Sequence, residues 1–207
     1  MDYDLIIEVL IIGDSAVGKT NLLMRYTEDK FDESSRPTIG SDYYKLHKNH
    51  GDYALLLKFW DTAGQEKYRS LSVKFYENAH AVLIVYDTCR RETFEKIDFW
   101  LQEVRNNCRR PVKIMLIGNK TDLVENRKVS TEEAKLFAMQ NEIMFMETSA
   151  KTNQDKSVNK AFDAILEDTA KILIQEELEK EREHISSVRG SIIQLNTETP
   201  KEKRPCC

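Results

Sequence analysis

Apolar residues along the chain follow two spacings, continuous short runs and helical periodicity, and polar stretches separate them. Predominantly apolar runs predict four strands, at residues 6–12, 81–86, 112–117 and 143–146. The continuous run 81–86 is typical of a strand that is buried on both faces. Two further strands are predicted at residues 41–48 and 54–60. The turn between these two is so short that they must be antiparallel.

Helical spacing of apolar residues fills most of the remaining chain. We expect a helix directly after residue 20 and a short one over residues 68–77. The sequence Ser130-Thr131-Glu132-Glu133 has the form of a capping box and begins another helix. The apolar positions that mark the last three helices are Phe94, Ile97, Leu101 and Val104; Ala134, Phe137 and Ala138; and Val158, Phe162, Ile165 and Leu166.

This alternation of strands and helices predicts an α/β fold. We expect a mostly parallel six-stranded sheet with one antiparallel hairpin strand and with helices on both faces. The loops that follow the parallel strands then meet at one edge of the sheet, where such folds bind their ligands.

The loop between the first strand and the first helix carries the pattern G-x-x-x-x-G-K-[ST], from Gly13 to Thr20. This pattern is the P-loop, in which backbone N–H groups and the following helix N-terminus surround a phosphate. Lys19 would reach the β- and γ-phosphates, and the Thr20 hydroxyl would bind Mg²⁺. The alternative is a simple tight turn, and the strand–loop–helix setting argues against it.

Three later loops carry candidate chemistry. Asp61 ends a strand in the string Asp61-Thr62-Ala63-Gly64-Gln65, where the acid can hold Mg²⁺, Gly64 can donate to a γ-phosphate and Gln65 can orient a water. In Asn119-Lys120-Thr121-Asp122, the Asp122 carboxylate can accept both donors on one edge of guanine, a pair that adenine lacks. In Thr148-Ser149-Ala150-Lys151, the Ala150 N–H could meet guanine O6. Each string has an alternative when taken singly: a helix cap or turn residue for Asp61, an ordinary loop for residues 119–122 and a helix-initiating turn for residues 148–151.

Composition narrows the class of protein. The chain has 207 residues, a net charge of −4 and an isoelectric point of about 5.7, which argue against general nucleic-acid binding. Its four cysteines form no CxxC pair, which argues against zinc and disulfide frameworks and favours a reduced, cytosolic setting. The acidic N-terminus does not read as a signal peptide, and the apolar runs are too short to span a bilayer.

The last part of the chain differs from the rest. Residues 176–183 are a charge run typical of a solvated helix end, and residues 186–205 are polar without sustained periodicity. We therefore expect a globular domain over residues 1–175 and a flexible tail over residues 176–207.

Together these strings resemble the small GTPases of the Ras superfamily, over roughly residues 5–173. Within it they are most similar to the Rab family, in residues 38–43, 58–66 and 82–87 and in the Cys206-Cys207 ending. The resemblance implies a P-loop NTPase G domain with Gln65 and Lys19 in catalysis and with Thr20, Thr38 and Asp61 on Mg²⁺. The residues that it assigns to GTP or GDP are Gly13, Asp14, Ser15, Ala16, Val17, Gly18, Lys19, Thr20, Asn21, Phe31, Thr38, Gly64, Asn119, Lys120, Asp122, Ser149, Ala150 and Lys151.

The resemblance also implies partners and a location. Effectors would bind two switch segments, about residues 31–40 and 64–76. The resemblance also implies that Tyr43, Trp60 and Phe75 form an aromatic surface that effectors contact, and the alternative for these three is plain core packing. An exchange factor, a GTPase-activating protein, a prenylation escort and a GDP-dissociation inhibitor would regulate the cycle. Lipid on Cys206 and Cys207 would anchor the protein to the cytoplasmic face of an endomembrane or the plasma membrane, with a cytosolic pool.

The function predicted from the sequence is therefore a Rab-like switch in vesicle trafficking that hydrolyses GTP slowly. Ser15 and Ala16 depart from the glycines found in Ras and could tune that rate. The alternatives are a binding module that holds nucleotide constitutively with negligible hydrolysis, and an ATP-dependent enzyme, which Asp122 argues against.

Overall fold

A computed structural model of the chain describes residues 3–34, 41–62 and 69–197. The chain forms two compact units, Met1–Ala170 and Lys171–Cys207. The first unit contains the whole sheet and all the loops that the sequence analysis connects with ligand binding.

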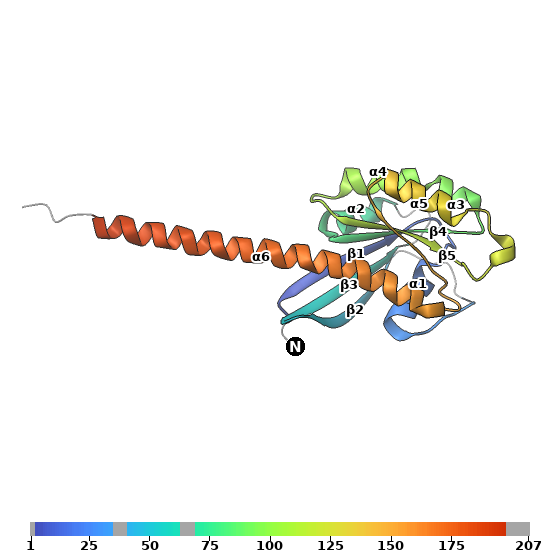
Figure 1. The fold of residues 1–207 in the computed structure, drawn as a ribbon, viewed down its shortest axis with the longest axis horizontal. Helices are drawn as coiled ribbons and strands as arrows, with labels where there is room; N and C mark the ends of the chain where they lie inside the picture. The colour runs from blue at the N-terminus through green and yellow to red at the C-terminus, as the bar shows by residue number, and fades with distance from the viewer. Residues whose placement is uncertain (1–2, 35–40, 63–68, 198–207) are drawn as a thin grey trace, which may run out of the picture. The chain divides into compact units, whose positions relative to one another are not determined.

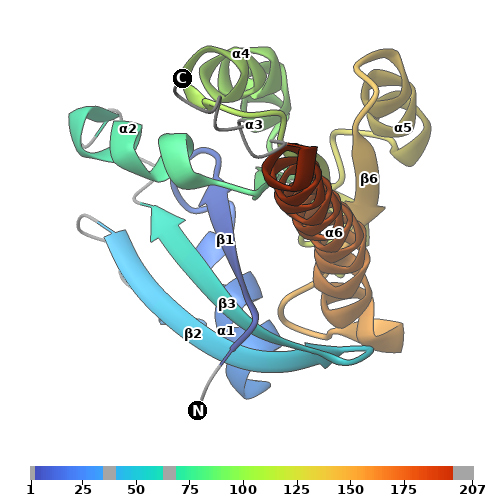
Figure 2. The same cartoon turned by 90° about the vertical axis from the view of Figure 1, so that its left-hand side faces the viewer.

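The sheet has six strands in the order β2-β3-β1-β4-β5-β6. Figure 1 labels β4 and β5, and Figure 2 labels β2, β3, β1 and β6. Every neighbouring pair is parallel except β2 and β3, which confirms the predicted fold class. The hairpin register pairs His50 with Tyr53, and Gly51 in the turn between them has a φ of 58°. The strands are β1 (Leu5–Ile12), β2 (Ser41–His50), β3 (Tyr53–Thr62), β4 (Ala81–Asp87), β5 (Lys113–Asn119) and β6 (Met144–Glu147).

Helices cover both faces of the sheet (Figure 1). One face carries α2, α3, α4 and α5, and the other carries α1 and the first turns of α6, up to Ala170. The helices are α1 (Lys19–Glu28), α2 (Arg69–Asn78), α3 (Arg91–Glu95), α4 (Ile97–Asn107), α5 (Thr131–Gln140) and α6 (Ser157–Thr197).

Each face of the sheet has its own core. Under α2, α4 and α5, strand residues such as Leu10 and Val82 pack against Leu101 and Ala138, all of them buried. On the other face the Tyr26 ring of α1 stacks on Phe162 of α6, with 4.5 Å between ring centroids. The helical positions that the sequence marked as inward-facing are buried, apart from Phe137, which packs partly buried against the core.

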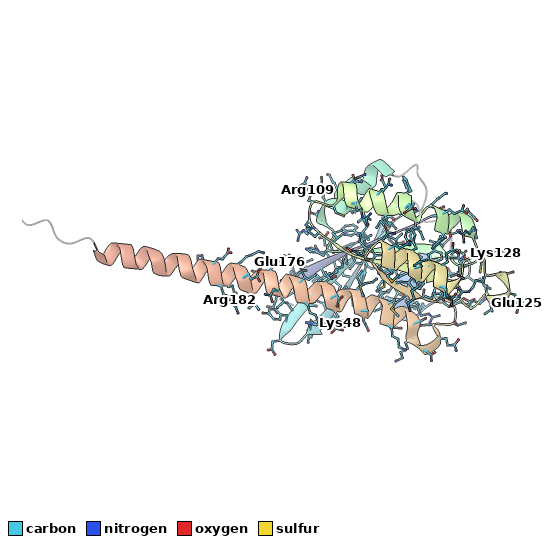
Figure 3. All side chains as sticks on the ribbon, turned by 45° about the horizontal axis from the view of Figure 1, so that its top comes forward. Lys48, Arg109, Glu125, Lys128, Glu176 and Arg182 are labelled. Atoms are coloured by element: carbon cyan, nitrogen blue, oxygen red, sulfur yellow. The ribbon has the colours of Figure 1, made fainter. Side chains whose placement is uncertain are left out.

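An ion pair holds the start of α6 against the hairpin. Lys48 of β2, which Figure 3 labels, lies beside α6. Its Nζ is 2.6 Å from the Asp163 carboxylate of that helix. The same carboxylate oxygen accepts a hydrogen bond from the Tyr26 hydroxyl at 2.9 Å. Hairpin, first helix and last helix therefore meet around one carboxylate.

Two elements differ from expectation. The helix predicted around Phe94 and Val104 divides at Lys96, whose φ of −86° and ψ of 0° separate α3 from α4. Residues 186–205 also lack sustained periodicity in the sequence, whereas α6 continues to Thr197. No proline interrupts residues 157–197, and a Lys180–Glu177 ion pair supports the charged part of the helix. Among the described helices none is long and apolar enough to cross a membrane. The domain boundary at residue 175 and the flexibility of the tail stay predictions.

Candidate nucleotide-binding site

The candidate site lies where the carboxyl ends of five parallel strands meet. The parallel pairings place the ends of β1, β3, β4, β5 and β6 along the same edge of the sheet. Every loop singled out from the sequence follows one of these ends, as expected for a parallel sheet that binds a ligand at its carboxyl edge.

The two glycines of the P-loop pack closely against β4 and against the end of β5. Gly13 has a φ of 136°, and a Cβ there would lie 2.2 Å from the Val85 carbonyl oxygen of β4. Gly18 caps α1 with a φ of 100°, and a Cβ there would lie 2.4 Å from the Asn119 side-chain nitrogen. Any side chain at either position would force the loop away from β4 or from the end of β5. Both glycines of the pattern are thus required by geometry.

Lys19 directs its ammonium group back into the P-loop. Its Nζ donates hydrogen bonds to the carbonyl oxygens of Gly13 at 2.8 Å and Asp14 at 3.0 Å. The residue is only 6% exposed, and burial lowers the pKa of its amine to about 8, although Asp61 and Asp14 act in the opposite direction. A partly desolvated cation at the N-terminus of α1 is a strong site for a phosphate anion.

Thr20 and Asp61 place two side-chain oxygen atoms next to each other. The Thr20 hydroxyl donates to Asp61 Oδ2 at 2.5 Å, and Asp61 is completely buried. The neighbouring Thr62 hydroxyl donates to the Ile11 carbonyl at 2.8 Å and fixes the end of β3 beside β1. Mg²⁺ is usually held by one or two carboxylates together with substrate phosphates and water, so this donor set fits the ion. The described residues contain no cluster of three His, Cys, Asp or Glu side chains that would indicate another metal site.

Asn119, at the end of β5, contacts both the P-loop and the loop after β6. Its Nδ2 donates to the Val17 carbonyl at 2.9 Å, while its Oδ1 accepts from the Ala150 backbone N–H at 3.3 Å. Asp122, two residues after Lys120, accepts a hydrogen bond from the Ser149 hydroxyl at 2.5 Å. The structure therefore brings the P-loop together with two motifs that lie about a hundred residues or more further along the chain.

Lys120 spans the distance between the loop after β5 and the P-loop. Its Nζ donates to the Ala16 carbonyl at 2.8 Å and forms an ion pair with Asp87 Oδ2 at 2.7 Å. Asp87, with a side chain only 3% exposed, also accepts from Arg90 Nε at 3.2 Å, and Arg90 Nη2 donates to the Ser15 carbonyl at 2.7 Å. One buried carboxylate thus orients two cations, and each cation holds one carbonyl of the P-loop.

No motif in the sequence marks this second layer of residues around the P-loop. Besides Asp87 and Arg90 it includes Lys96, whose Nζ lies 2.6 Å from Asp14 Oδ2, and Trp100, whose indole N–H donates to Asp14 Oδ1 at 3.1 Å. The only available signal was that Asp87 is a polar residue at the end of a buried strand. Lys96 and Trp100 lie more than eighty residues from Asp14, so no local pattern identifies them.

Other predicted residues fall beside the site or beyond the described chain. Phe31 is half-buried, and Lys151 pairs with Glu33 at 2.8 Å. Trp60 lies 4.6 Å from Tyr43 and 4.5 Å from Phe75, measured between ring centroids. Tyr43 is 39% exposed, while Trp60 and Phe75 pack partly buried against the core. These three aromatic rings therefore extend from the core to the surface. The predicted residues outside the described ranges are Thr38, Gly64, Gln65, Cys206 and Cys207.

The fold and the site define a class of protein: a P-loop protein whose further loops carry the N-K-x-D and S-A-K strings. Comparison with known proteins names the family. The sequence model of the Ras family matches residues 8–171, and the chain belongs to this family.

Curated relatives cover the whole chain. It is 36% identical to GTP-binding protein ypt3 of Schizosaccharomyces pombe, over 100% of this chain and 98% of that protein. It is 37% identical to Ras-related protein Rab-25 of Homo sapiens and 38% identical to Ras-related protein Rab11B of Nicotiana tabacum, over 100% of this chain and 95% of each relative. The protein is therefore a Rab-like small GTPase, and the constitutive binding module is not favoured.

Proposed function

We propose that this Rab-like GTPase acts as a Mg²⁺-dependent switch in vesicle trafficking, with its nucleotide held between the P-loop and the loops after β5 and β6. One observation carries the proposal: Asn119 binds the Val17 carbonyl of the P-loop and the Ala150 N–H of the base loop through one amide. This amide sets the spacing between the phosphate-binding loop and the base-binding loop.

Each end of the nucleotide has its own residues in this proposal. Lys19 and the N-terminus of α1 neutralise the β- and γ-phosphates, while Thr20 and Asp61 supply oxygen ligands to Mg²⁺. Asp122, oriented by the Ser149 hydroxyl, accepts the N1–H and N2 amine of guanine. Lys120 lies along the base, and Phe31 packs against it.

Hydrolysis and signalling depend on the two switch segments. Gln65 orients the attacking water, Gly64 donates to the γ-phosphate, and Thr38 binds Mg²⁺ only in the triphosphate state. Loss of the γ-phosphate releases both segments, so that effectors bind only the GTP form. As for Rab and Ras proteins generally, exchange factors and GTPase-activating proteins drive the cycle. A GDP-dissociation inhibitor and a prenylation escort would act on lipidated Cys206 and Cys207.

The choice of base provides the experiment. Asp122→Asn replaces one of two acceptors by a donor, so GDP affinity should fall by at least about tenfold, because a buried unmet hydrogen bond costs about 1–3 kcal/mol. Xanthosine diphosphate, which carries a carbonyl in place of the guanine amine, should bind the variant better than the parent. Asp52→Asn, in the exposed turn between β2 and β3, is the matched control and should change neither affinity. Unchanged GDP affinity in Asp122→Asn would remove Asp122 from the base site.

A further inference from the structure

The first helix contacts the segment that follows it through a reciprocal pair of hydrogen bonds. Asn21 Nδ2 donates to the Asp32 carbonyl oxygen at 2.9 Å, and Asn21 Oδ1 accepts from the Asp32 backbone N–H at 2.9 Å. Asn21 is only 9% exposed, so both bonds are sheltered from water. One side-chain amide thus holds both backbone polar groups of Asp32, the residue directly after Phe31.

One turn further along α1, Arg25 binds the loop after β6. Its Nε donates to the Ala150 carbonyl at 2.9 Å and its Nη2 to the Lys151 carbonyl at 3.3 Å. Its Nη1 donates to the Asp29 carbonyl at 2.8 Å, and the Arg25 side chain is only 15% exposed. The planar guanidinium therefore connects the base-binding loop to the end of α1.

These two side chains lie on a rigid support. Leu22 and Leu23, between Asn21 and Arg25, are completely buried in the core beneath α1. A third contact, the Lys151–Glu33 ion pair at 2.8 Å, links the loop after β6 directly to segment 29–34. Its two side chains are 50% and 78% exposed, so we expect this ion pair to contribute little.

We propose that Asn21 and Arg25, here called the α1 bracket, are positioning residues that set how fast nucleotide dissociates from its base end. The inference rests on the proposed function, since it takes the base site to lie between Phe31 and the loop of residues 149–151. The bracket holds both walls of that site against α1. Nucleotide can leave at this end only when segment 29–34 or the loop separates from α1.

The bracket acts independently of the metal. Thr20 and Asp61 hold the phosphate end, whereas Asn21 and Arg25 contact backbone groups at the base end through their side chains. Removal of Mg²⁺ and removal of the bracket should therefore accelerate dissociation by separate factors that multiply. A residue that merely supported the metal site would lose its effect once the metal is removed.

The experiment measures dissociation of a fluorescent GDP analogue from the full chain, in Mg²⁺ and in EDTA. Asn21→Ala removes both bonds to Asp32 and retains a strong helix former. It should raise the rate about tenfold under both conditions, the factor that corresponds to two net hydrogen bonds. Arg25→Lys keeps the charge but lacks the forked guanidinium that contacts two carbonyls of the loop after β6. It should therefore also raise the dissociation rate in Mg²⁺ and in EDTA. Thr27→Ala is the control on the same helix, because its hydroxyl donates to the Leu23 carbonyl of α1 and to no other group of the described residues, and it should change neither rate.

Amide hydrogen exchange provides a second readout that does not depend on dissociation kinetics. The Asp32 N–H, protected by Asn21 Oδ1, should exchange faster in Asn21→Ala and as in the parent in Thr27→Ala. Faster exchange with an unchanged dissociation rate would overturn the inference, and so would an acceleration that disappears in EDTA. If Asn21→Ala does not fold, the dissociation rates of Arg25→Lys test the inference instead. An unchanged rate, or an acceleration that disappears in EDTA, would again overturn it. Failure of the parent protein to bind GDP would instead contradict the proposed function.

Discussion

At the scale of single residues, the protonation of Lys19 gives a prediction about pH. Burial lowers the pKa of its amine to about 8, and a bound phosphate stabilises the charged form and raises that pKa again. GDP binding near pH 8 should therefore take up protons, and GDP affinity should fall as the pH rises through about 8. Calorimetric titrations at pH 8 in two buffers of different ionisation enthalpy measure the uptake. Binding enthalpies that do not depend on the buffer would contradict the lowered pKa.

The same shift predicts the sign of a stability change in the protein without nucleotide. Between about pH 8 and the ordinary lysine pKa of 10.5, the unfolded chain binds more protons at Lys19 than the folded one. The contribution of Lys19 to folding stability should therefore rise with pH across that window.

Ala16 is the second residue with a testable consequence. Its φ of 62° places it in the left-handed region, where an L-residue other than glycine is strained by about 1–2 kcal/mol. Ala16→Gly should stabilise the protein by about 0.5–1 kcal/mol, since the greater freedom of glycine in the unfolded chain cancels part of the gain. Ala164→Gly, in the interior of α6, is the control and should destabilise by about 1 kcal/mol. Urea unfolding at one GDP concentration, corrected for each variant's GDP affinity, measures the free energy of unfolding of both variants. A change of the same sign in Ala16→Gly and Ala164→Gly would contradict the strain at Ala16.

At the scale of elements, the start of α5 contains the serine half of the predicted capping box. Ser130 caps the helix, with its hydroxyl accepting from the Glu133 N–H at 3.1 Å, as the capping box predicts. The Glu133 carboxylate pairs with Arg91 of α3 at 2.6 Å. Ser130→Ala should cost about 1 kcal/mol of stability and Ser130→Asp much less, because aspartate also caps. Equal losses in the two variants, measured by urea unfolding, would show that the cap does not stabilise α5.

The elements also show where prediction from sequence succeeds and where it stops. Strands such as residues 81–86 and the glycines of the P-loop depend on residues that are close in sequence. Hydrophobic periodicity therefore predicts the strands, and motif spacing predicts the P-loop. The break at Lys96 has no proline or glycine to signal it, and it appears with the contact of Lys96 to Asp14 in the P-loop. The Asp87, Arg90 and Trp100 contacts likewise depend on which strands are neighbours, which only the folded sheet determines.

At the scale of the whole molecule, the property to explain is how the protein attaches to a membrane. Rab proteins associate with membranes through lipid anchors, and none of the described helices can span a bilayer. We propose Cys206 and Cys207 as the lipid acceptors, because two lipid chains anchor stably where one binds only marginally. Lys201, Lys203 and Arg204 should add little, since each basic residue contributes about 1 kcal/mol at an anionic surface and Glu202 interrupts them.

Changing both Cys206 and Cys207 to serine should move the protein from the membrane fraction to the soluble fraction while GDP binding persists. The matched control changes the other two cysteines, Cys89 and Cys108, to serine and should leave membrane association intact. Both of these lie half-buried in the folded domain, and burial raises the pKa of the Cys108 thiol to about 11, which keeps it poorly reactive. Fractionation of cells that express each variant measures the distribution. A Cys206→Ser, Cys207→Ser variant that still sediments with membranes would rule out lipid on these residues and point to a protein receptor.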